Sequence, residues 1–137
     1  YHVREVMERM YSATPDGYCG DQDNGQTSAW YVFSALGFYP VTPASDQYAL
    51  GSPLFRKAVL KFENGRTLIL NADNNTKDTP YVAGLMVNGT DYNRNYITHG
   101  IILDGGQIDF DMVSEPNMSK QINKDSYPYS FSCDENK

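Results

Sequence analysis

The fold class is decided by the stretch Ala58-Val59-Leu60-Lys61-Phe62-Glu63-Asn64-Gly65-Arg66-Thr67-Leu68-Ile69-Leu70. Two runs rich in apolar and β-branched residues flank a polar turn that contains Asn64-Gly65. Asn-Gly between apolar runs is the strongest short signal for a β-hairpin, because both residues tolerate the left-handed backbone of a tight turn. The stretch therefore predicts two antiparallel strands, 58–62 and 67–70.

Short apolar segments separated by turn residues continue on the C-terminal side of this hairpin. The strand candidates there are residues 84–87, 96–98, 101–103 and 108–113. Asn88-Gly89 and Asp104-Gly105-Gly106 provide turn chemistry between them. Short strands at such close spacing predict an antiparallel β-sandwich, which we expect over residues 46–115. The chain then becomes polar, and an extended tail is expected over residues 116–137.

On the N-terminal side of Pro43 the apolar period changes from two to 3.6 residues. Residues 2–12 place apolar side chains on one face, which predicts an amphipathic helix. A second helix is expected over residues 26–36, with Gly37 as its C-terminal cap. It is apolar on nearly all sides, so packing partners outside this chain are expected. The predicted class is α+β, with a helical segment over residues 1–45 ahead of the sandwich.

The charge of the chain excludes several classes of partner. Seventeen acidic residues against eleven basic ones give a net charge of −6, and the basic residues are scattered. Nucleic acids and anionic membrane surfaces both require clustered Lys and Arg, so neither is expected as a partner. No apolar run approaches the roughly 20 residues that span a bilayer, so no membrane insertion is expected. The chain opens within a helical pattern and without an initiator Met, which favours a segment of a longer protein.

Cysteine and histidine spacing indicates no metal motif. Cys19 and Cys133 lie near opposite ends, and neither a CxxC nor a Cys/His pattern is present, so their pairing stays open. His2 and His99 are isolated in the sequence, which favours surface or structural roles over metal binding. Metal ligands within the chain are therefore not identified from its residues.

The polar loop Gly20-Asp21-Gln22-Asp23-Asn24-Gly25-Gln26, between the two predicted helices, holds the candidate functional residues. Its carboxylates can cap the helix that follows. An EF-hand is excluded, because its required Gly and Glu positions are occupied by Gln26 and Val32. The remaining interpretation is acid–base chemistry on a sugar, in which one carboxylate activates water and its neighbour tunes it. Gln26 is expected to contact either a substrate or the helix N-terminus.

Residues 17–40, GYCGDQDNGQTSAWYVFSALGFYP, resemble the signature segment of glycoside hydrolase family 92. The resemblance continues through residues 48–55 and the β-region to residues 127–132. It implies a calcium-dependent exo-α-mannosidase that removes terminal mannose with inversion, with α-1,2 as the expected linkage. It also implies that the two helices are a remnant of an (α/α)6 barrel.

The resemblance implies particular roles for two aspartates: Asp23 as the base that activates water, and Asp21 as its assistant. It places the general acid and most calcium ligands before residue 1, so the chain alone is expected to be inactive. The implied partners are mannose-containing glycans and the remainder of the parent chain, at a secreted, periplasmic or cell-surface location. The rival hypothesis is a non-catalytic carbohydrate-binding or structural β-sandwich module, which leaves the aspartate loop without a purpose.

Overall fold

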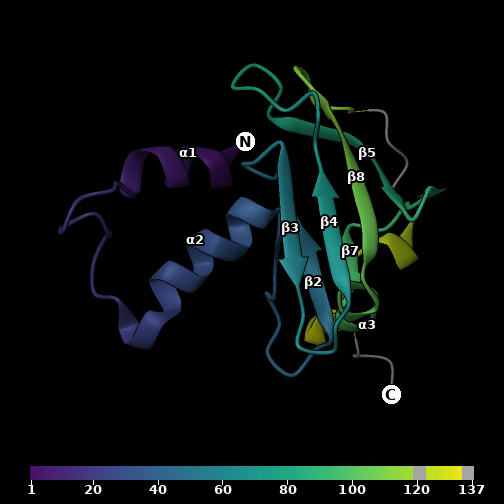
Figure 1. The fold of residues 1–137 in the computed structure, drawn as a ribbon, viewed down its shortest axis with the longest axis horizontal. Helices are drawn as coiled ribbons and strands as arrows, with labels where there is room; N and C mark the ends of the chain where they lie inside the picture. Colours follow the sequence, from purple (N-terminus) through teal and green to yellow (C-terminus); the bar gives the residue numbers. More distant parts are fainter. Residues whose placement is uncertain (119–122, 134–137) are drawn as a thin grey trace.

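Two N-terminal helices lie beside a body made of two β-sheets in the computed structural model, which describes residues 1–118 and 123–133 (Figure 1). The helices are α1 (His2–Met10) and α2 (Gln26–Leu36). The α+β class is thus confirmed. Helix α2 has the predicted bounds, and Gly37 caps it with a left-handed backbone at φ 94°, its amide donating to the carbonyl oxygens of Phe33 and Ser34. Helix α1 ends two residues earlier than predicted.

The strands form one three-stranded and one five-stranded sheet. The smaller sheet has the order β1 (Phe38–Tyr39), β2 (Gln47–Leu50), β7 (Tyr96–Thr98), and both of its pairs are antiparallel. The larger sheet has the order β3 (Lys57–Lys61), β4 (Thr67–Asn71), β8 (Gly106–Val113), β5 (Tyr81–Val87), β6 (Thr90–Asp91).

The hairpin predicted from Asn64-Gly65 is confirmed. Strands β3 and β4 pair antiparallel over their whole length, with Leu60 opposite Leu68. Gly65 lies at φ 80°, and its amide donates to the carbonyl oxygen of Phe62 at 3.0 Å. The open space around Gly65 shows that backbone conformation, not crowding, is what requires a glycine there.

Two expectations for the β-region are wrong. The sandwich is not wholly antiparallel, because β8 pairs in parallel with β4 and antiparallel with β5. Residues 101–103 are not a strand but belong to the short helix α3 (His99–Asp104). Thr98 caps this helix by accepting a hydrogen bond from the amide of Ile101, and Gly105 ends it at φ 74°. An apolar run of three residues has no readable period, and the cap decides its structure.

The main core lies where the two sheets face each other. Alternate residues of β8 are buried, while Asp109 and Asp111 point away from the core, because successive side chains of a strand face opposite sides. The buried cluster comprises Phe38, Leu68, Leu70, Ala72, Leu85, Ile97, Ile102, Ile108, Phe110 and Met112. No helix in the described part of the chain has the length and apolar character to cross a bilayer.

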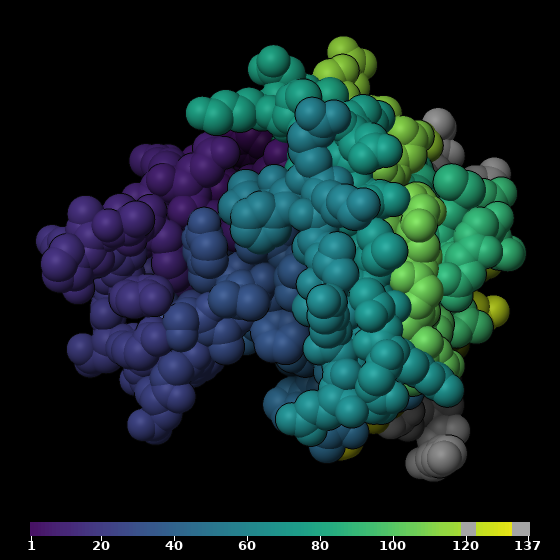
Figure 2. Space-filling model, in the orientation of Figure 1, coloured from purple at the N-terminus to yellow at the C-terminus, as the bar shows by residue number. Residues whose placement is uncertain are grey.

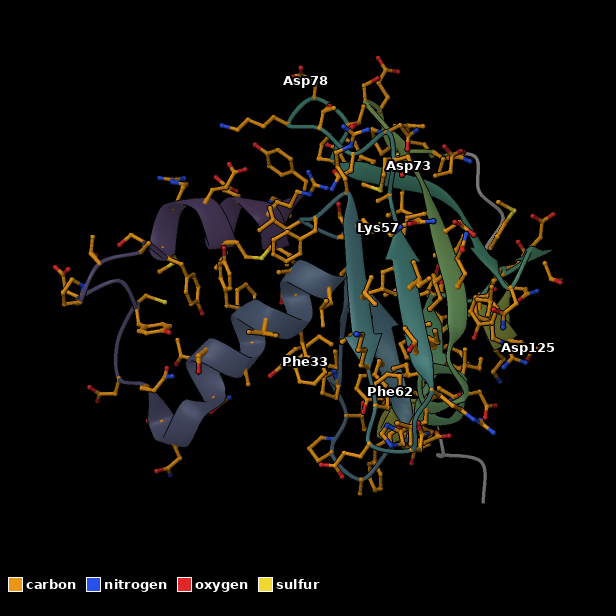
Figure 3. All side chains as sticks on the ribbon, in the orientation of Figure 1. Phe33, Lys57, Phe62, Asp73, Asp78 and Asp125 are labelled. Atoms are coloured by element: carbon orange, nitrogen blue, oxygen red, sulfur yellow. The ribbon has the colours of Figure 1, made fainter. Side chains whose placement is uncertain are left out.

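Both helices contact the sheet body at the helix ends that lie closest to it. Arg4 of α1 is 7% exposed, and its guanidinium donates to the carbonyl oxygens of Pro53 and Thr76 and to the side chain of Asn75. Burial lowers the pKa of Arg4, although Glu8 opposes this shift. Phe33 of α2 lies between that helix and the sheets (Figure 3). Its ring packs against the rings of Phe38 and Tyr48, with centroid distances of 5.9 and 6.1 Å.

The C-terminal part is described at residues 114–118 and 123–133, where its regular elements are the short 3-10 turns η2 (Lys124–Ser126) and η3 (Phe131–Cys133). Ser126 is buried, and its carbonyl oxygen accepts from the amide of Asn95 at 2.7 Å. The rest of the predicted tail, residues 119–122 and 134–137, lies outside the described residues.

Candidate active site

The aspartate loop lies at the end of the helical pair that is remote from the sheets (Figure 1). The helices form a lobe beside the sheet body (Figure 2). After α1 the chain closes a turn in which the amide of Ser12 donates to the carbonyl oxygen of Gly17 at 2.9 Å. A Cβ at Gly17 would lie 1.9 Å from the carbonyl oxygen of Ser12, so this turn requires glycine.

The backbone of the loop is strained next to the predicted base. Asp23, Asn24 and Gly25 are consecutive residues with left-handed φ angles of 46°, 58° and 92°. This conformation costs most non-glycine residues about 1–2 kcal/mol, and Asp and Asn adopt it more readily than the others. They form the 3-10 turn η1 (Asp23–Gly25), which leads directly into α2. Strain of this kind persists only where neighbouring contacts hold it, and it concentrates at functional sites.

Neither aspartate of the loop caps helix α2. Its N-cap residue is Gly25, which has no side chain, and no side-chain cap bond is formed there. Asp21 and Asp23 are exposed, and their carboxylates make no hydrogen bond or ion pair with any residue the structure describes. The capping interpretation is therefore wrong for both, and both carboxylates remain free to meet a ligand.

The residue that does fasten the loop to the helix is Gln22, which sequence reasoning missed. Its side-chain Oε1 accepts from the amide of Ser28 at 3.2 Å, and its Nε2 donates to the Ser28 hydroxyl at 2.5 Å. The Gln22 carbonyl oxygen accepts from the amides of Gly25 and Thr27. The Thr27 hydroxyl completes the set by donating to the carbonyl oxygen of Asp21 at 3.0 Å. A glutamine six residues ahead of its partner matches no established capping pattern, so the sequence offered no signal for it.

Gln26 is placed as the first residue of α2. Its side chain is exposed and makes no hydrogen bond to another described residue. The structure therefore places Asp21, Asp23 and Gln26 close together in the sequence, in the loop and at the first position of α2, and the polar ends of all three bond no other residue that the structure describes.

An aromatic cluster joins the segment that follows α1 to helix α2. Tyr11 stacks on Trp30 with ring centroids 5.6 Å apart, and it contacts Tyr31 and Tyr18 at 5.0 and 6.1 Å. Burial raises the pKa of Tyr11. A hollow of about 380 Å³ is lined by Tyr11, Ser12, Ala13, Gly17, Tyr18, Ser28, Tyr31 and Val32. Trp30 is thus engaged in packing.

The residues present do not fit a complete calcium site. Calcium takes six to eight oxygen ligands. The described residues contain no group of three or more His, Cys, Asp or Glu side chains that could hold a metal ion. Cys19 is a free thiol, and the side chain of Cys133 lies outside the described part. Asp21 and Asp23 alone are too few oxygen donors for a calcium cage.

Three comparisons relate the chain to known proteins. Residues 1–114 match the glycosyl hydrolase family 92 catalytic domain. A solved structure of a family GH92 inverting mannosidase from Bacteroides thetaiotaomicron is 47% identical, with a TM-score of 0.88 over 96% of this chain and 18% of its own. A GH92 α-mannosidase from the same bacterium is 38% identical, with a TM-score of 0.88 over 95% of this chain and 18% of its own.

A curated relative, an uncharacterized secreted glycosidase of Arthroderma benhamiae, is 28% identical over 108 residues, which are 77% of this chain and 14% of that protein. The chain thus spans only a small part of the length of the relatives it matches. The resemblance read from residues 17–40 is confirmed. Because the catalytic-domain family covers residues 1–114 of 137, the chain belongs to glycosyl hydrolase family 92.

Proposed function

We propose that this chain is part of a calcium-dependent inverting exo-α-mannosidase, which removes terminal mannose from glycans and prefers α-1,2 linkages. The single observation that carries the proposal is the loop of Asp21 and Asp23, whose two exposed carboxylates have no partner among the described residues. Membership of family 92 supports the reaction class. One solved relative is named an inverting mannosidase.

In this proposal Asp23 is the general base. An inverting glycosidase uses one carboxylate to take a proton from water as that water attacks the anomeric carbon. A second carboxyl group, about 6.5–9.5 Å away on the other face of the sugar, protonates the leaving oxygen. Asp21 assists, because a second negative charge close by favours transfer of the water proton to Asp23. The Asp23 carboxylate accepts no hydrogen bond from the residues that the structure describes, which supports this role, since its oxygens are available to water.

The general acid and most calcium ligands are proposed to come from outside this chain. A carboxylate oxygen of Glu5 lies 2.9 Å from a guanidinium nitrogen of Arg9. This contact lowers the pKa of Glu5, whereas a general acid needs a raised pKa. Bound calcium would hold and polarise sugar hydroxyls, and the described residues of this chain do not complete its cage.

The helices are proposed to belong to an (α/α)6 barrel completed by the rest of a family-length chain. Helix α2 is apolar on most sides, yet only Ser34 and Ala35 are buried along it, and Val32 is 56% exposed. An apolar helix left this open is expected to pack against more helices. We propose residues 1–45 as the barrel segment, 46–115 as the accompanying sandwich and 116–137 as a tail. A secreted, periplasmic or cell-surface location and mannose-containing glycans as substrates complete the proposal.

The test is Asp23→Asn in the full-length enzyme, which keeps the shape of the side chain while removing the base. We expect kcat on an α-1,2-mannobioside to fall about 10²–10⁴-fold, with little change in KM. Asp21→Asn should reduce kcat less. An Asp23→Asn enzyme that retains more than about a tenth of the wild-type kcat contradicts the proposal. Comparison with α-1,3-, α-1,4- and α-1,6-mannobiosides tests the linkage separately.

A further inference from the structure

The strained backbone around Asp23 is held by a bond network with Gln22 at its centre. Gln22 is the one loop residue whose side chain reaches forward into α2, where it meets both the amide and the hydroxyl of Ser28. The Ser28 hydroxyl in turn donates to the carbonyl oxygen of Gly25 at 3.2 Å. The side chain of Gln22 therefore closes a ring around η1, the turn that contains Asp23.

We propose that Gln22 is a positioning residue, which fixes the carboxylate of Asp23 through Ser28. This inference rests on the proposed function of Asp23 and extends it to a residue without a chemical role of its own. Asp23 and Asn24 adopt left-handed φ angles, and neither side chain bonds to a residue that the structure describes. The side-chain bonds of Gln22 to Ser28, and the bond of the Ser28 hydroxyl to the carbonyl oxygen of Gly25, restrain this turn.

Placement matters here because general-base catalysis depends on the distance between the carboxylate oxygen and the attacking water. A displacement of about 1 Å can cost a factor of about 10² in rate. A loop without the Gln22 restraint can relax Asp23 and Asn24 toward ordinary φ angles, and this relaxation redirects the Asp23 side chain. The substrate contacts made elsewhere are untouched, so the loss should fall on kcat.

Substitutions at positions 22 and 28 of the full-length enzyme test this role. Gln22→Met keeps the length of the side chain and removes both bonds, and we expect kcat to fall on the order of 10- to 100-fold with KM nearly constant. Ser28→Ala removes the hydroxyl alone and should cause a smaller fall. Ser28→Thr keeps a hydroxyl and should restore most of the rate. Gln107→Met is the matched control, since that glutamine is exposed on β8 and its side chain bonds only Asp109 among the described residues.

A double-mutant cycle separates positioning from a general loss of stability. If Gln22 acts through Asp23, Gln22→Met should add little to the loss already caused by Asp23→Asn. The inference is overturned if Gln22→Met lowers kcat by the same factor in Asp23→Asn as in the wild type. It is also overturned if Gln22→Met alone leaves kcat unchanged. If Gln22→Met does not fold, the contrast between Ser28→Ala and Ser28→Thr decides the same question. A full rate in Asp23→Asn overturns the proposed function instead, so the two failures are distinguishable.

Discussion

Arg4 and Asn75 lie 71 residues apart in the sequence and pair in the interior, where a guanidinium nitrogen of Arg4 donates to Oδ1 of Asn75. The amide nitrogen of Asn75 donates in turn to the carbonyl oxygens of Pro53, Leu54 and Phe55 at 3.0, 3.1 and 3.3 Å. One side-chain pair therefore joins helix α1 to two separate loops of the sheet body. Helix α1 leads into the aspartate loop, so this pair helps to determine the position of the two helices relative to the sheets.

Arg4→Met should destabilise the fold, because it leaves Oδ1 of Asn75 and the carbonyl oxygen of Thr76 without their buried donor. We expect the free energy of unfolding to fall by about 2 kcal/mol, the cost of one or two buried acceptors left unpaired. Urea unfolding followed by circular dichroism measures it. Arg9→Met is the control, since Arg9 is exposed and pairs only with Glu5 on the same helix, and it should change stability far less. Equal effects of the two substitutions would show that the buried network contributes nothing.

Gly105→Ala should be far more damaging than Gly89→Ala, although both glycines have positive φ angles, 74° and 78°. A Cβ at Gly105 would lie 2.6 Å from the carbonyl oxygen of Thr67, whereas no atom lies within 4 Å of a Cβ at Gly89. Gly89→Ala then carries backbone strain alone, about 1 kcal/mol. Gly105→Ala adds a clash with backbone on β4, worth about 1–3 kcal/mol more. Thermal melting of the two variants gives the comparison, and similar melting temperatures would refute it.

The isolated chain should bind calcium weakly or not at all. The cation requires six to eight oxygens, and the described residues offer no cluster of three ligating side chains. Isothermal titration calorimetry with CaCl2 measures the affinity. A submicromolar dissociation constant would contradict this prediction and would direct attention to carboxylates of this chain as principal ligands.

The isolated chain should also lack mannosidase activity, because the proposed general acid lies elsewhere in the protein. Assays on mannobiosides at high enzyme concentration test this, with the full-length enzyme as the positive control. Turnover by the chain alone would place the acid within it. Specific binding to a glycan array without turnover in either protein would favour the rival hypothesis of a carbohydrate-binding module.

Local signals in the sequence predicted the elements that local chemistry determines. Helix α2 has the expected bounds because Gly37 ends it, and the β3–β4 hairpin forms where Asn64-Gly65 required a turn. Helix α3 was not predicted, because its apolar run is too short to show a period; Thr98 caps it. The choice of β4 as a parallel neighbour of β8 depends on contacts far apart in the sequence, which no local pattern encodes.

The candidate site was predictable in composition but not in geometry. The sequence placed Asp21 and Asp23 in a loop ahead of α2, and this is where they lie. It could not reveal that Gly25 caps the helix or that Gln22 bonds Ser28. Those features accompany the left-handed turn at Asp23 and Asn24; Asp and Asn tolerate this conformation, but their presence in a loop does not require it. The catalytic roles of the two aspartates stay predictions.

Strand β8 occupies the centre of the five-stranded sheet, yet it is the last strand in the described part of the chain. As the polypeptide leaves the ribosome, the β3–β4 and β5–β6 hairpins emerge first, each with an edge that β8 covers in the finished sheet. Exposed edges of this kind invite pairing with other chains. Assembly of the sheet therefore waits for Gly106–Val113, and a nascent or truncated product that stops short of this segment would carry two more open edges than the complete sheet and tend to aggregate.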